Sequence, residues 1–400
     1  MERLAILGGS SPFTAELLRA LEEARLVGWE LMLYGRSHEG IEALTRLART
    51  RLGRLGWQIY GTDRLIEALD GAGTIIHQIR YGGMEGRATD EALAQRFGVP
   101  ADETLGPAGL QSALRTLAGL EQLADAIAQQ CPTATVLNLT NPLSLTTWVL
   151  SRRGVRKCIG LCELPWTTVC LASGLLGLPP HQVHWRYTGL NHRGFICELN
   201  HAGQNRLGEF IDTLGEGTIE GIAAAEIRQL GALPLKYHRL FRTRGRGDHG
   251  RAAELMALRQ QLLAELRERP GEYPLSLGQR RMPWYRESVV PALRALGGGP
   301  PLQQTYNTYG SDGVVREVQG CLRAAKLDLD PWYPGEGAVR EWLERFVAHE
   351  RAVTAVAVAP SLEGIEQALA SDPSLHGQGV RDLAVSIWEG YQATTPLLPA

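Results

Sequence analysis

The N-terminal half of the chain alternates short apolar runs with amphipathic stretches, and this alternation limits the fold more than any other feature. Apolar runs predict strands at residues 3–7, 30–34, 74–79, 135–139 and 157–161. After the first run, Leu17, Leu18 and Leu21 lie on one face of a helix predicted over residues 14–24. Strands covered by helices on both faces are almost wholly apolar, so the pattern predicts an α/β fold with a doubly wound parallel sheet.

The pattern changes after the fifth predicted strand. Residues 184–190 and 194–199 predict two antiparallel strands, and long helical segments follow them. Residues 242–251 are charged and rich in glycine, which predicts an exposed loop. We therefore expect a first domain over residues 1–165 and a second, α+β domain over residues 166–400.

Charge and composition indicate the class of partner. Lys and Arg number 41 against 43 Asp and Glu, so no excess of positive charge points to nucleic acid or an anionic membrane. No stretch approaches the roughly 18 apolar residues of a membrane span, and the apolar run at residues 4–7 is too short for a signal peptide. We expect a cytoplasmic protein with reduced cysteines and small-molecule partners, without a nucleic-acid or membrane partner.

A glycine-containing turn, Gly8-Gly9-Ser10-Ser11, joins the first predicted strand to the first helix. Backbone N–H groups at a helix N-terminus hold the pyrophosphate of a dinucleotide, and glycines let the backbone approach it. The run is a degraded form of the dinucleotide fingerprint, because serine or phenylalanine stands at its third glycine position. Its place at the start of an alternating half predicts a Rossmann domain that binds NAD through these four residues; an ordinary tight turn is the alternative.

The second predicted strand ends in Tyr34-Gly35-Arg36-Ser37. An Asp or Glu is expected there to bond the adenosine ribose hydroxyls. Its absence removes repulsion of a 2′-phosphate, and Arg36 with Ser37 supplies a cation and a hydroxyl for one. Arg36 is therefore a candidate cofactor-binding residue and makes NADP an alternative to NAD; the competing interpretation is a solvated loop arginine.

Three polar segments stand where strands are expected to end, at residues 139–142, 160–165 and 189–194. Ligands of open α/β sheets bind outside those ends. Cys162 and His192 supply a thiolate and an imidazole from two of the segments, a partial shell for a transition metal that leaves positions for substrate oxygens. The alternatives are an inert buried cysteine and a histidine that caps a turn.

Several motifs resemble those of glycoside hydrolase family 4, in the family's order and at about its spacing. Residues 78–91, Gln-Ile-Arg-Tyr-Gly-Gly-Met-Glu-Gly-Arg-Ala-Thr-Asp-Glu, resemble the pattern Q-x-R-x-G-G-x-E-x-R-x-x-D-E. The resemblance continues through Glu103-Thr104-Leu105-Gly106-Pro107, Thr140-Asn141-Pro142, Leu161-Cys162-Glu163-Leu164-Pro165, Gly189-Leu190-Asn191-His192 and Leu233-Pro234-Leu235-Lys236-Tyr237. It is poor between residues 300 and 337, where Asn307, Gly310 and Asp312 echo a turn of the family.

The resemblance implies a Rossmann domain followed by an α+β domain like the C-terminal domain of lactate and malate dehydrogenases. It also implies a glycosidase, of the 6-phospho-glucosidase type, that works without the usual pair of carboxylates. In that route NAD takes hydride from C3 of the sugar, a base removes the C2 proton, the aglycone is eliminated, water adds, and the retained NADH reduces C3 again. A divalent metal, by preference manganese, is the second cofactor implied.

Each role implied by the resemblance falls on a residue of this chain. Cys162 and His192 match the metal ligands, and Tyr237 matches the base, whose pKa a nearby cation would lower; His238 is a rival base. Glu163 stands where the family has Asp or Asn, and would be a general acid, a group that reaches the metal or an orienting carboxylate. The implied substrate contacts are Arg87, Glu103, Asn141, Arg280 and Arg281. The three arginines would bind a 6-phosphate of the sugar; the alternative is that they form structural ion pairs with carboxylates.

Two other classes stay open at this point. A dehydrogenase of the lactate and malate type shares the expected architecture, but it consumes nicotinamide stoichiometrically and needs no metal pair. A non-catalytic dinucleotide- or sugar-binding relative would bind its ligands without cleaving a bond. By analogy with the family we also expect a homodimer or homotetramer.

Overall fold

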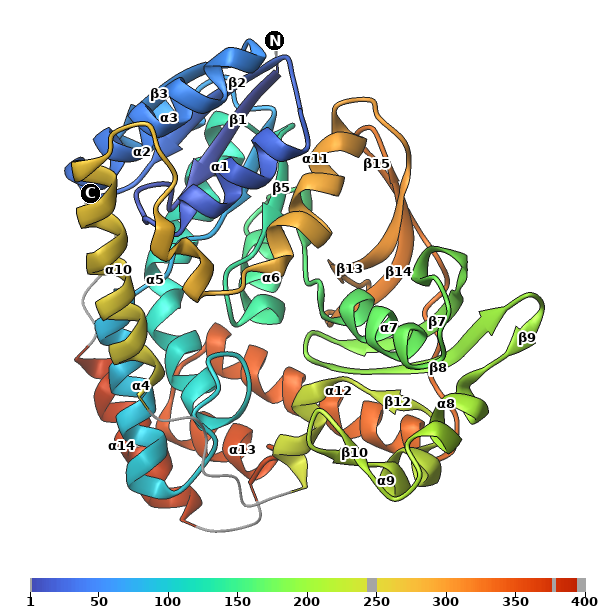
Figure 1. Cartoon of the computed structure of the whole chain (residues 1–400). Helices are drawn as coiled ribbons and strands as arrows, with labels where there is room; N and C mark the ends of the chain where they lie inside the picture. The colour runs from blue at the N-terminus through green and yellow to red at the C-terminus, as the bar shows by residue number, and fades with distance from the viewer. Residues whose placement is uncertain (1, 243–249, 376–378, 394–400) are drawn as a thin grey trace.

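The computed structural model describes residues 2–242, 250–375 and 379–393, and most of the loop predicted at residues 242–251 lies outside them (Figure 1). The strands are β1 (Glu2–Leu7), β2 (Trp29–Tyr34), β3 (Gln58–Thr62), β4 (Thr74–His77), β5 (Thr135–Asn138), β6 (Lys157–Gly160), β7 (His184–Leu190), β8 (Arg193–His201), β9 (Gln204–Asn205), β10 (Thr218–Ile219), β11 (Ile222–Ala223), β12 (Leu233–Pro234), β13 (Leu302–Tyr309), β14 (Val315–Arg323) and β15 (Lys326–Leu329). The α-helices are α1 (Thr14–Glu23), α2 (His38–Arg51), α3 (Leu65–Leu69), α4 (Gly83–Phe97), α5 (Gly106–Gln130), α6 (Leu143–Arg152), α7 (Leu164–Leu175), α8 (Leu207–Thr213), α9 (Ala224–Leu230), α10 (Arg251–Glu268), α11 (Val290–Leu296), α12 (Gly337–Val358), α13 (Leu362–Ala370) and α14 (Val380–Gln392).

Thirteen of these strands form one sheet, in the order β12-β8-β7-β14-β13-β6-β5-β4-β1-β2-β3, with β15 paired to β14 and β9 to β8. The five strands predicted in the first half are β1, β2, β4, β5 and β6, and they run parallel. The two predicted antiparallel strands are β7 and β8. The predicted α/β fold class is therefore confirmed.

Besides the two-residue strands β9 and β12, two parts of the sheet were not predicted. Strand β3 is the edge strand, and three of its five residues are exposed, so it lacks the apolar run of a covered strand. Strands β13, β14 and β15 form an antiparallel meander whose first two strands enter the sheet between β6 and β7. This meander carries buried polar side chains, among them Gln304, Thr305, Asn307 and Glu317, which conceal the apolar pattern.

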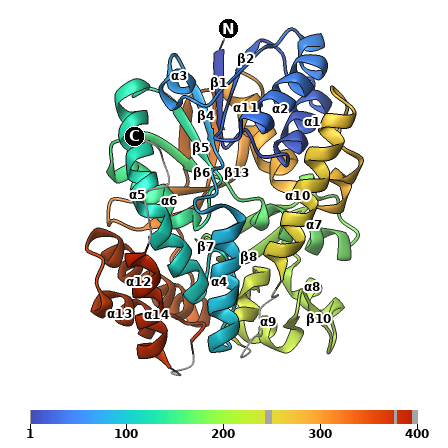
Figure 2. The ribbon, with the colours of Figure 1, turned by 90° about the vertical axis from the view of Figure 1, so that its left-hand side faces the viewer.

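Alternate residues of the parallel strands face two apolar layers. Leu4 and Ile6 of β1 pack in a cluster with α1, α2, α10 and α11, whereas Ala5 and Leu7 pack with α3, α5, α6 and α14. Figure 2 shows α1, α2 and α10 on one side of these strands and α5 and α6 on the other. Helices α10 and α11 come from the C-terminal half, so both halves of the chain build the first layer, and the domain boundary after residue 165 stays a prediction.

The topology determines where a ligand can bind. Strands β1 and β4 are neighbours, but the connection that leaves β1 leads to β2 on one side, and the connection that leaves β4 leads to β5 on the other. A crevice opens at such a switch point, outside the carboxyl ends of parallel strands. Within the described residues, no helix combines the length and the apolar character that crossing a membrane requires.

Candidate active site

A cavity of about 660 Å³ lies at the carboxyl edge of the parallel strands. Its volume falls within the roughly 300–1,000 Å³ typical of small-molecule sites. Eleven of the fourteen predicted site residues line it: Gly8, Ser10, Ser11, Arg36, Glu103, Asn141, Cys162, Glu163, His192, Tyr237 and Arg280. Gly9, Arg87 and Arg281 do not line it. The fold therefore gathers segments from across more than half of the chain into one site.

The turn after β1 forms one end of this cavity. Gly8 has a φ of 92°, and a Cβ there would lie 2.8 Å from a backbone carbonyl oxygen, so glycine alone fits. The N–H groups of Gly8 and Gly9 both donate to the Tyr34 carbonyl, at 3.0 and 2.7 Å, and tie the turn to β2. Gly9 thus packs beneath the turn, while Gly8, Ser10 and Ser11 face the cavity.

Arg36 and Ser37 follow β2 and also line the cavity. Ser37 begins α2, where its hydroxyl oxygen accepts a hydrogen bond from the Gly40 N–H at 3.2 Å. Arg259 of α10 lines the same cavity and forms no ion pair with any residue that the structure describes. It was not predicted, because more than 200 residues separate it from the turn and nothing local marks it.

Cys162 and Glu163 stand between β6 and α7. The Leu161 N–H donates to the Asn138 carbonyl at 3.0 Å, which keeps this segment in line with β5 as it enters the cavity. Burial, and then the charges of Glu317 and Glu163, raise the pKa of the Cys162 thiol well above its ordinary value. Burial also raises the pKa of the Glu163 carboxyl. With no cation beside it, the thiol keeps its proton at neutral pH.

His192 lies in the two-residue turn between β7 and β8 and has a φ of 63°. Its ring stacks on Tyr237, with centroids 4.3 Å apart and planes inclined by 15°. Its Nδ1 is buried without a hydrogen-bond partner, as are both polar side-chain atoms of Asn191. Burial and the charge of Lys236 lower the pKa of His192 to about 3, so the imidazole is neutral, as metal binding requires.

These donors fit a divalent transition metal. The thiol and the imidazole face one cavity, and the unpartnered Nδ1 of His192 is a donor atom without another use in the described structure. Within residues 2–242, 250–375 and 379–393, no three His, Cys, Asp or Glu side chains are grouped as a complete ligand set. Two protein donors leave the remaining positions to substrate and water, which is the arrangement of an open catalytic site.

Tyr237 lies in a 3₁₀ segment, Lys236–Phe241, and lines the cavity beside His192. The Lys236 Nζ is 5.3 Å from its ring centroid. Burial and the charges of Asp102 and Glu103 raise the pKa of Tyr237. The lowering expected from the sequence relies on a cation bound near the phenol, so it stays a prediction.

The rival base, His238, points elsewhere. Its ring packs edge-on against Phe241 and Trp342, and its Nε2 is 3.1 Å from a Glu226 carboxylate oxygen. It does not line the cavity. Of the two candidate bases, which are adjacent in the sequence, only Tyr237 therefore faces the cavity.

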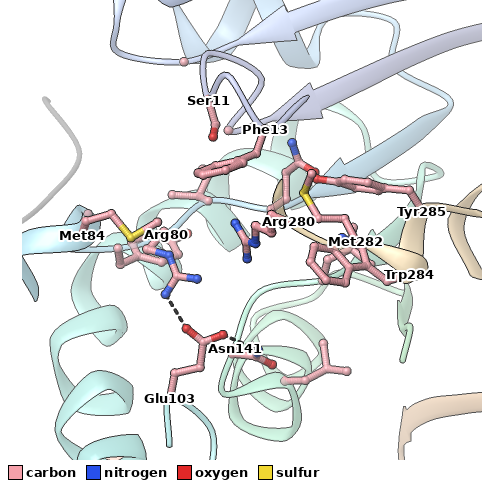
Figure 3. Close-up of a pocket in the computed structure, with 18 of the residues that line it drawn as sticks. Ser11, Phe13, Arg80, Met84, Glu103, Asn141, Arg280, Met282, Trp284 and Tyr285 are labelled. Carbon is pink, nitrogen blue, oxygen red and sulfur yellow. Dashed lines mark hydrogen bonds and ion pairs between the residues drawn. The ribbon is translucent and has the colours of Figure 1, made fainter. Parts of the chain in front are cut away.

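Two arginines line the middle of the cavity. Figure 3 shows the side chains of Arg80 and Arg280 converging there, with Glu103 and Asn141 beneath them in that view. Arg280 stacks on Phe13, at 4.6 Å, and forms no ion pair among the described residues. Burial and the like charge of Arg80 lower its pKa to about 10, so it stays protonated at neutral pH. Two cations that face one space form a site for an anion.

Glu103 organises the floor of this site. One of its oxygens accepts from Arg80 and Arg87, at 2.6 Å each, and the other from the Asn141 amide at 3.3 Å. Burial raises the pKa of Glu103, but Arg80 and Arg87 outweigh it and hold the pKa far below its usual value. Arg87 also donates to Glu91 at 2.9 Å, so it forms ion pairs behind the cavity rather than facing it.

Besides Arg259, two more residues in or behind this site were missed from the sequence. Arg80 stands in the motif at residues 78–91 that matched the family, and that motif was the available signal for it. Glu317 lies behind Cys162 on β14, in the segment where the likeness is poor, and no charge pattern predicts a buried carboxylate there. Arg281, by contrast, is exposed and turned away from the cavity.

Comparison with known proteins identifies relatives of this chain. Residues 3–176 match the model of a family described as family 4 glycosyl hydrolase. A probable 6-phospho-beta-glucosidase of Bacillus subtilis is 26% identical over 340 residues, which cover 78% of this chain and 77% of that protein. The 6-phospho-beta-glucosidase BglT of Thermotoga maritima is 30% identical over 208 residues, covering 51% of this chain and 49% of that protein.

Solved structures extend the likeness to the whole fold. The 6-phospho-beta glucosidase of Thermotoga maritima with manganese, NAD⁺ and glucose-6-phosphate has a TM-score of 0.87 at 22% identity and covers 100% of both chains. Malate dehydrogenase of Plasmodium falciparum has a TM-score of 0.54 at 12% identity and covers 90% of this chain and 99% of that one, so it shares the architecture more loosely. The resemblance seen in the sequence motifs is confirmed: residues 3–176 match the model of family 4 glycosyl hydrolases, and the whole chain shares the fold of a related 6-phospho-beta glucosidase.

Proposed function

We propose that this chain is a glycosidase that hydrolyses a 6-phosphorylated glucoside with the help of a bound nicotinamide dinucleotide and a divalent metal. The observation that carries the proposal is that one cavity contains a nucleotide-type turn, a thiol–imidazole pair and two converging arginines. Relatives named as 6-phospho-glucosidases support the substrate, and a related structure with manganese, NAD⁺ and glucose-6-phosphate supports the cofactors.

Cys162 and His192 are the proposed metal ligands, and Gly8, Ser10 and Ser11 the proposed contacts of the dinucleotide. When bound, the nicotinamide supplies a hydride acceptor for C3 of the sugar, and the metal, manganese in this proposal, polarises the oxygens at C2 and C3. Cys162 must give up its proton for this, because the thiolate is the form that binds metals.

The other side chains orient the sugar and move protons. Glu103 stays ionised and, with Asn141, accepts and donates hydrogen bonds to sugar hydroxyls. Tyr237, stacked beside His192, removes the C2 proton at its phenolic oxygen. Burial raises the pKa of Glu163, which favours its role as the general acid that donates a proton to the leaving glycosidic oxygen.

The direct test is hydrolysis of p-nitrophenyl α- and β-glucosides, with and without a 6-phosphate, in Mn²⁺ and reductant with NAD⁺ or NADP⁺. Release of p-nitrophenol without net accumulation of reduced nicotinamide is the expected result. No p-nitrophenol under any combination, together with a rise in reduced-nicotinamide absorbance, would identify a dehydrogenase instead. Binding of dinucleotide and sugar phosphate without either signal would identify a non-catalytic relative.

Arg280→Met is expected to reduce kcat/KM for the 6-phosphorylated glucoside by roughly 10- to 100-fold, since a hydrogen bond to a charged group contributes about 1.5–3 kcal/mol. The rate with the unphosphorylated glucoside should change little, because it has no phosphate to lose. Steady-state kinetics on the two substrates measures the difference. Arg281→Met is the matched control, since this neighbour is exposed and does not line the cavity. An equal loss on both substrates would rule out a phosphate contact.

Arg36→Ala is expected to weaken NADP⁺ binding by roughly tenfold or more and to leave NAD⁺ binding unchanged, because only NADP⁺ presents a 2′-phosphate to a guanidinium. Arg259→Ala should act in the same direction, since Arg259 lines the same cavity. Fluorescence titration of the reduced cofactors measures both affinities, and Arg46→Ala on the exposed face of α2 is the control. NAD⁺ binding that equals or exceeds NADP⁺ binding in every variant would exclude the phosphate contact.

The remaining expectations from the sequence are a cytoplasmic location and a homodimer or homotetramer, and both stay predictions. Light scattering of the purified chain at several concentrations tests the subunit count. A mass of one chain at all concentrations would contradict it.

A further inference from the structure

Strands β6 and β7 lead to the two proposed metal ligands, yet they are not neighbours in the sheet. The hairpin of β13 and β14 lies between them, in the order β7-β14-β13-β6. Cys162 comes two residues after the end of β6, and His192 comes two residues after the end of β7. The distance between the thiol and the imidazole therefore depends on how this hairpin fits.

Each side of the hairpin meets its neighbour at one residue pair within the described sheet: Asn307 opposite Gly160, and Glu317 opposite Gly189. Neither glycine leaves room for a side chain. A Cβ on Gly160 would lie 2.8 Å from the Asn307 Cβ, and one on Gly189 would lie 2.4 Å from a backbone Cα of β8. The hairpin thus fits closely against β6, and it pairs with β7 at Gly189, whose other side is packed against β8.

Glu317 is the side chain that joins these strands. Its Oε1 accepts a hydrogen bond from the Asn307 amide at 2.9 Å, across the hairpin. Its Oε2 accepts a short hydrogen bond from the hydroxyl of Tyr187 on β7. Glu317 and Asn307 are both 0% exposed. Burying a carboxylate is costly unless hydrogen bonds compensate, so these two bonds explain why it is tolerated here.

The carboxylate is also linked to the strand that leads to the thiol. Its partner Asn307 stands opposite Gly160, two residues before Cys162. Glu317 does not line the cavity, and it belongs to no complete ligand set among the described side chains. Its position is that of a group that acts on the metal ligands from behind.

We propose that Glu317 is a positioning residue that, bonded to Asn307 and Tyr187, sets the separation of Cys162 and His192 and so tunes the affinity and selectivity of the metal site. The inference rests on the proposed pairing of Cys162 with His192. Groups that orient metal ligands in this way typically contribute 10- to 100-fold in affinity, so about that loss is expected without Glu317.

The test is titration of the full chain with Co²⁺, followed by thiolate-to-cobalt charge-transfer absorption, and with Mn²⁺ and Zn²⁺ by calorimetry. Glu317→Ala and Asn307→Ala are expected to weaken Co²⁺ and Mn²⁺ binding by about 10- to 100-fold. They should also shift the absorption band and change the ratio of Mn²⁺ to Zn²⁺ affinity. Glu317→Gln keeps the volume and one acceptor oxygen, so it is expected to recover most of the affinity.

Gln319→Ala is the matched control, because Gln319 also joins β14 to β7 but farther from the site. Its side chain accepts from the Tyr187 N–H at 2.9 Å and donates to the Trp185 carbonyl at 3.0 Å. Gln319→Ala should lower the Tm as the other variants do and leave metal affinity unchanged. If metal affinity falls in parallel with the Tm in all variants, including Gln319→Ala, then Glu317 has only a structural role and the inference is overturned.

Three further results would show whether the positioning role or the metal pair itself is wrong. If Glu317→Gln loses as much as Glu317→Ala while Asn307→Ala binds normally, Glu317 is a direct ligand and the positioning role is wrong. A wild-type chain without the absorption band would overturn the metal pair itself, and this inference with it. A wild-type band that no Glu317 variant alters would overturn the positioning role alone.

Discussion

Cys162→Ser is expected to abolish metal retention and to lower hydrolysis of the 6-phosphorylated glucoside by on the order of 10³-fold. A metal contributes several kcal/mol of charge stabilisation, and each 1.36 kcal/mol corresponds to a factor of about ten in rate. Serine keeps the size of the side chain but has no thiolate to offer. Metal content after dialysis and kcat/KM at saturating Mn²⁺ measure the two losses.

The pKa of the thiol gives this experiment a second readout. Burial and neighbouring carboxylates raise that pKa, so the free thiol is protonated at neutral pH and must release its proton when a metal binds. Metal affinity should therefore increase as pH rises, by up to about tenfold per pH unit below the thiol pKa, and this dependence should vanish in Cys162→Ser. Cys170→Ser, at a free and partly exposed thiol of α7, is the control. If the Cys162→Ser variant keeps its metal and its activity, the assignment of Cys162 as a metal ligand is wrong.

Tyr237→Phe is expected to lower kcat by about 10²- to 10⁴-fold, the usual contribution of a general base, with little change in metal content. The stacking of residue 237 on His192 survives this substitution, because phenylalanine keeps the ring. A substrate deuterated at C2 should react more slowly than the protiated one in the wild type if removal of that proton limits the rate.

The neighbouring histidine separates the two candidate bases. His238→Gln should reduce stability, because His238 packs among aromatic side chains, and should leave the C2 isotope effect as it is. Both variants are compared at a temperature where circular dichroism shows them folded. The proposed base would be contradicted if the Tyr237→Phe variant stayed active and the wild type showed no isotope effect at C2.

The parallel half of the sheet was predictable because covered strands leave a continuous apolar signal. Strands β1, β2, β4, β5 and β6 all carry it, and the predicted positions agree with the structure to within two residues. Strand β3 carries no such signal, since it is exposed at the sheet edge. In the meander of β13, β14 and β15, buried polar residues interrupt the apolar pattern, and their hydrogen-bond partners lie on other strands.

Charged residues were harder to assign, because a guanidinium reaches far and its direction depends on packing. Arg80 and Arg87 stand seven positions apart in one matched motif, yet Arg80 faces the cavity and Arg87 faces Glu91. Arg280 and Arg281 are adjacent, and only the first turns inward, where it stacks on Phe13. Sequence spacing does not encode these directions.

The sequence by itself determined the α/β fold class, the resemblance to family 4 of the glycosyl hydrolases and the candidate ligand pair, because these depend on local periodicity and on motifs that lie within a few residues. The tertiary structure decided which side chains share the cavity: Arg80, Arg259 and Arg280 line it together with Arg36, and His238 lies outside it. It also put Glu317 behind Cys162, 155 positions away in the chain, through a hairpin inserted between two ligand-bearing strands. Such contacts arise from strand order and burial, which no local pattern of residues records.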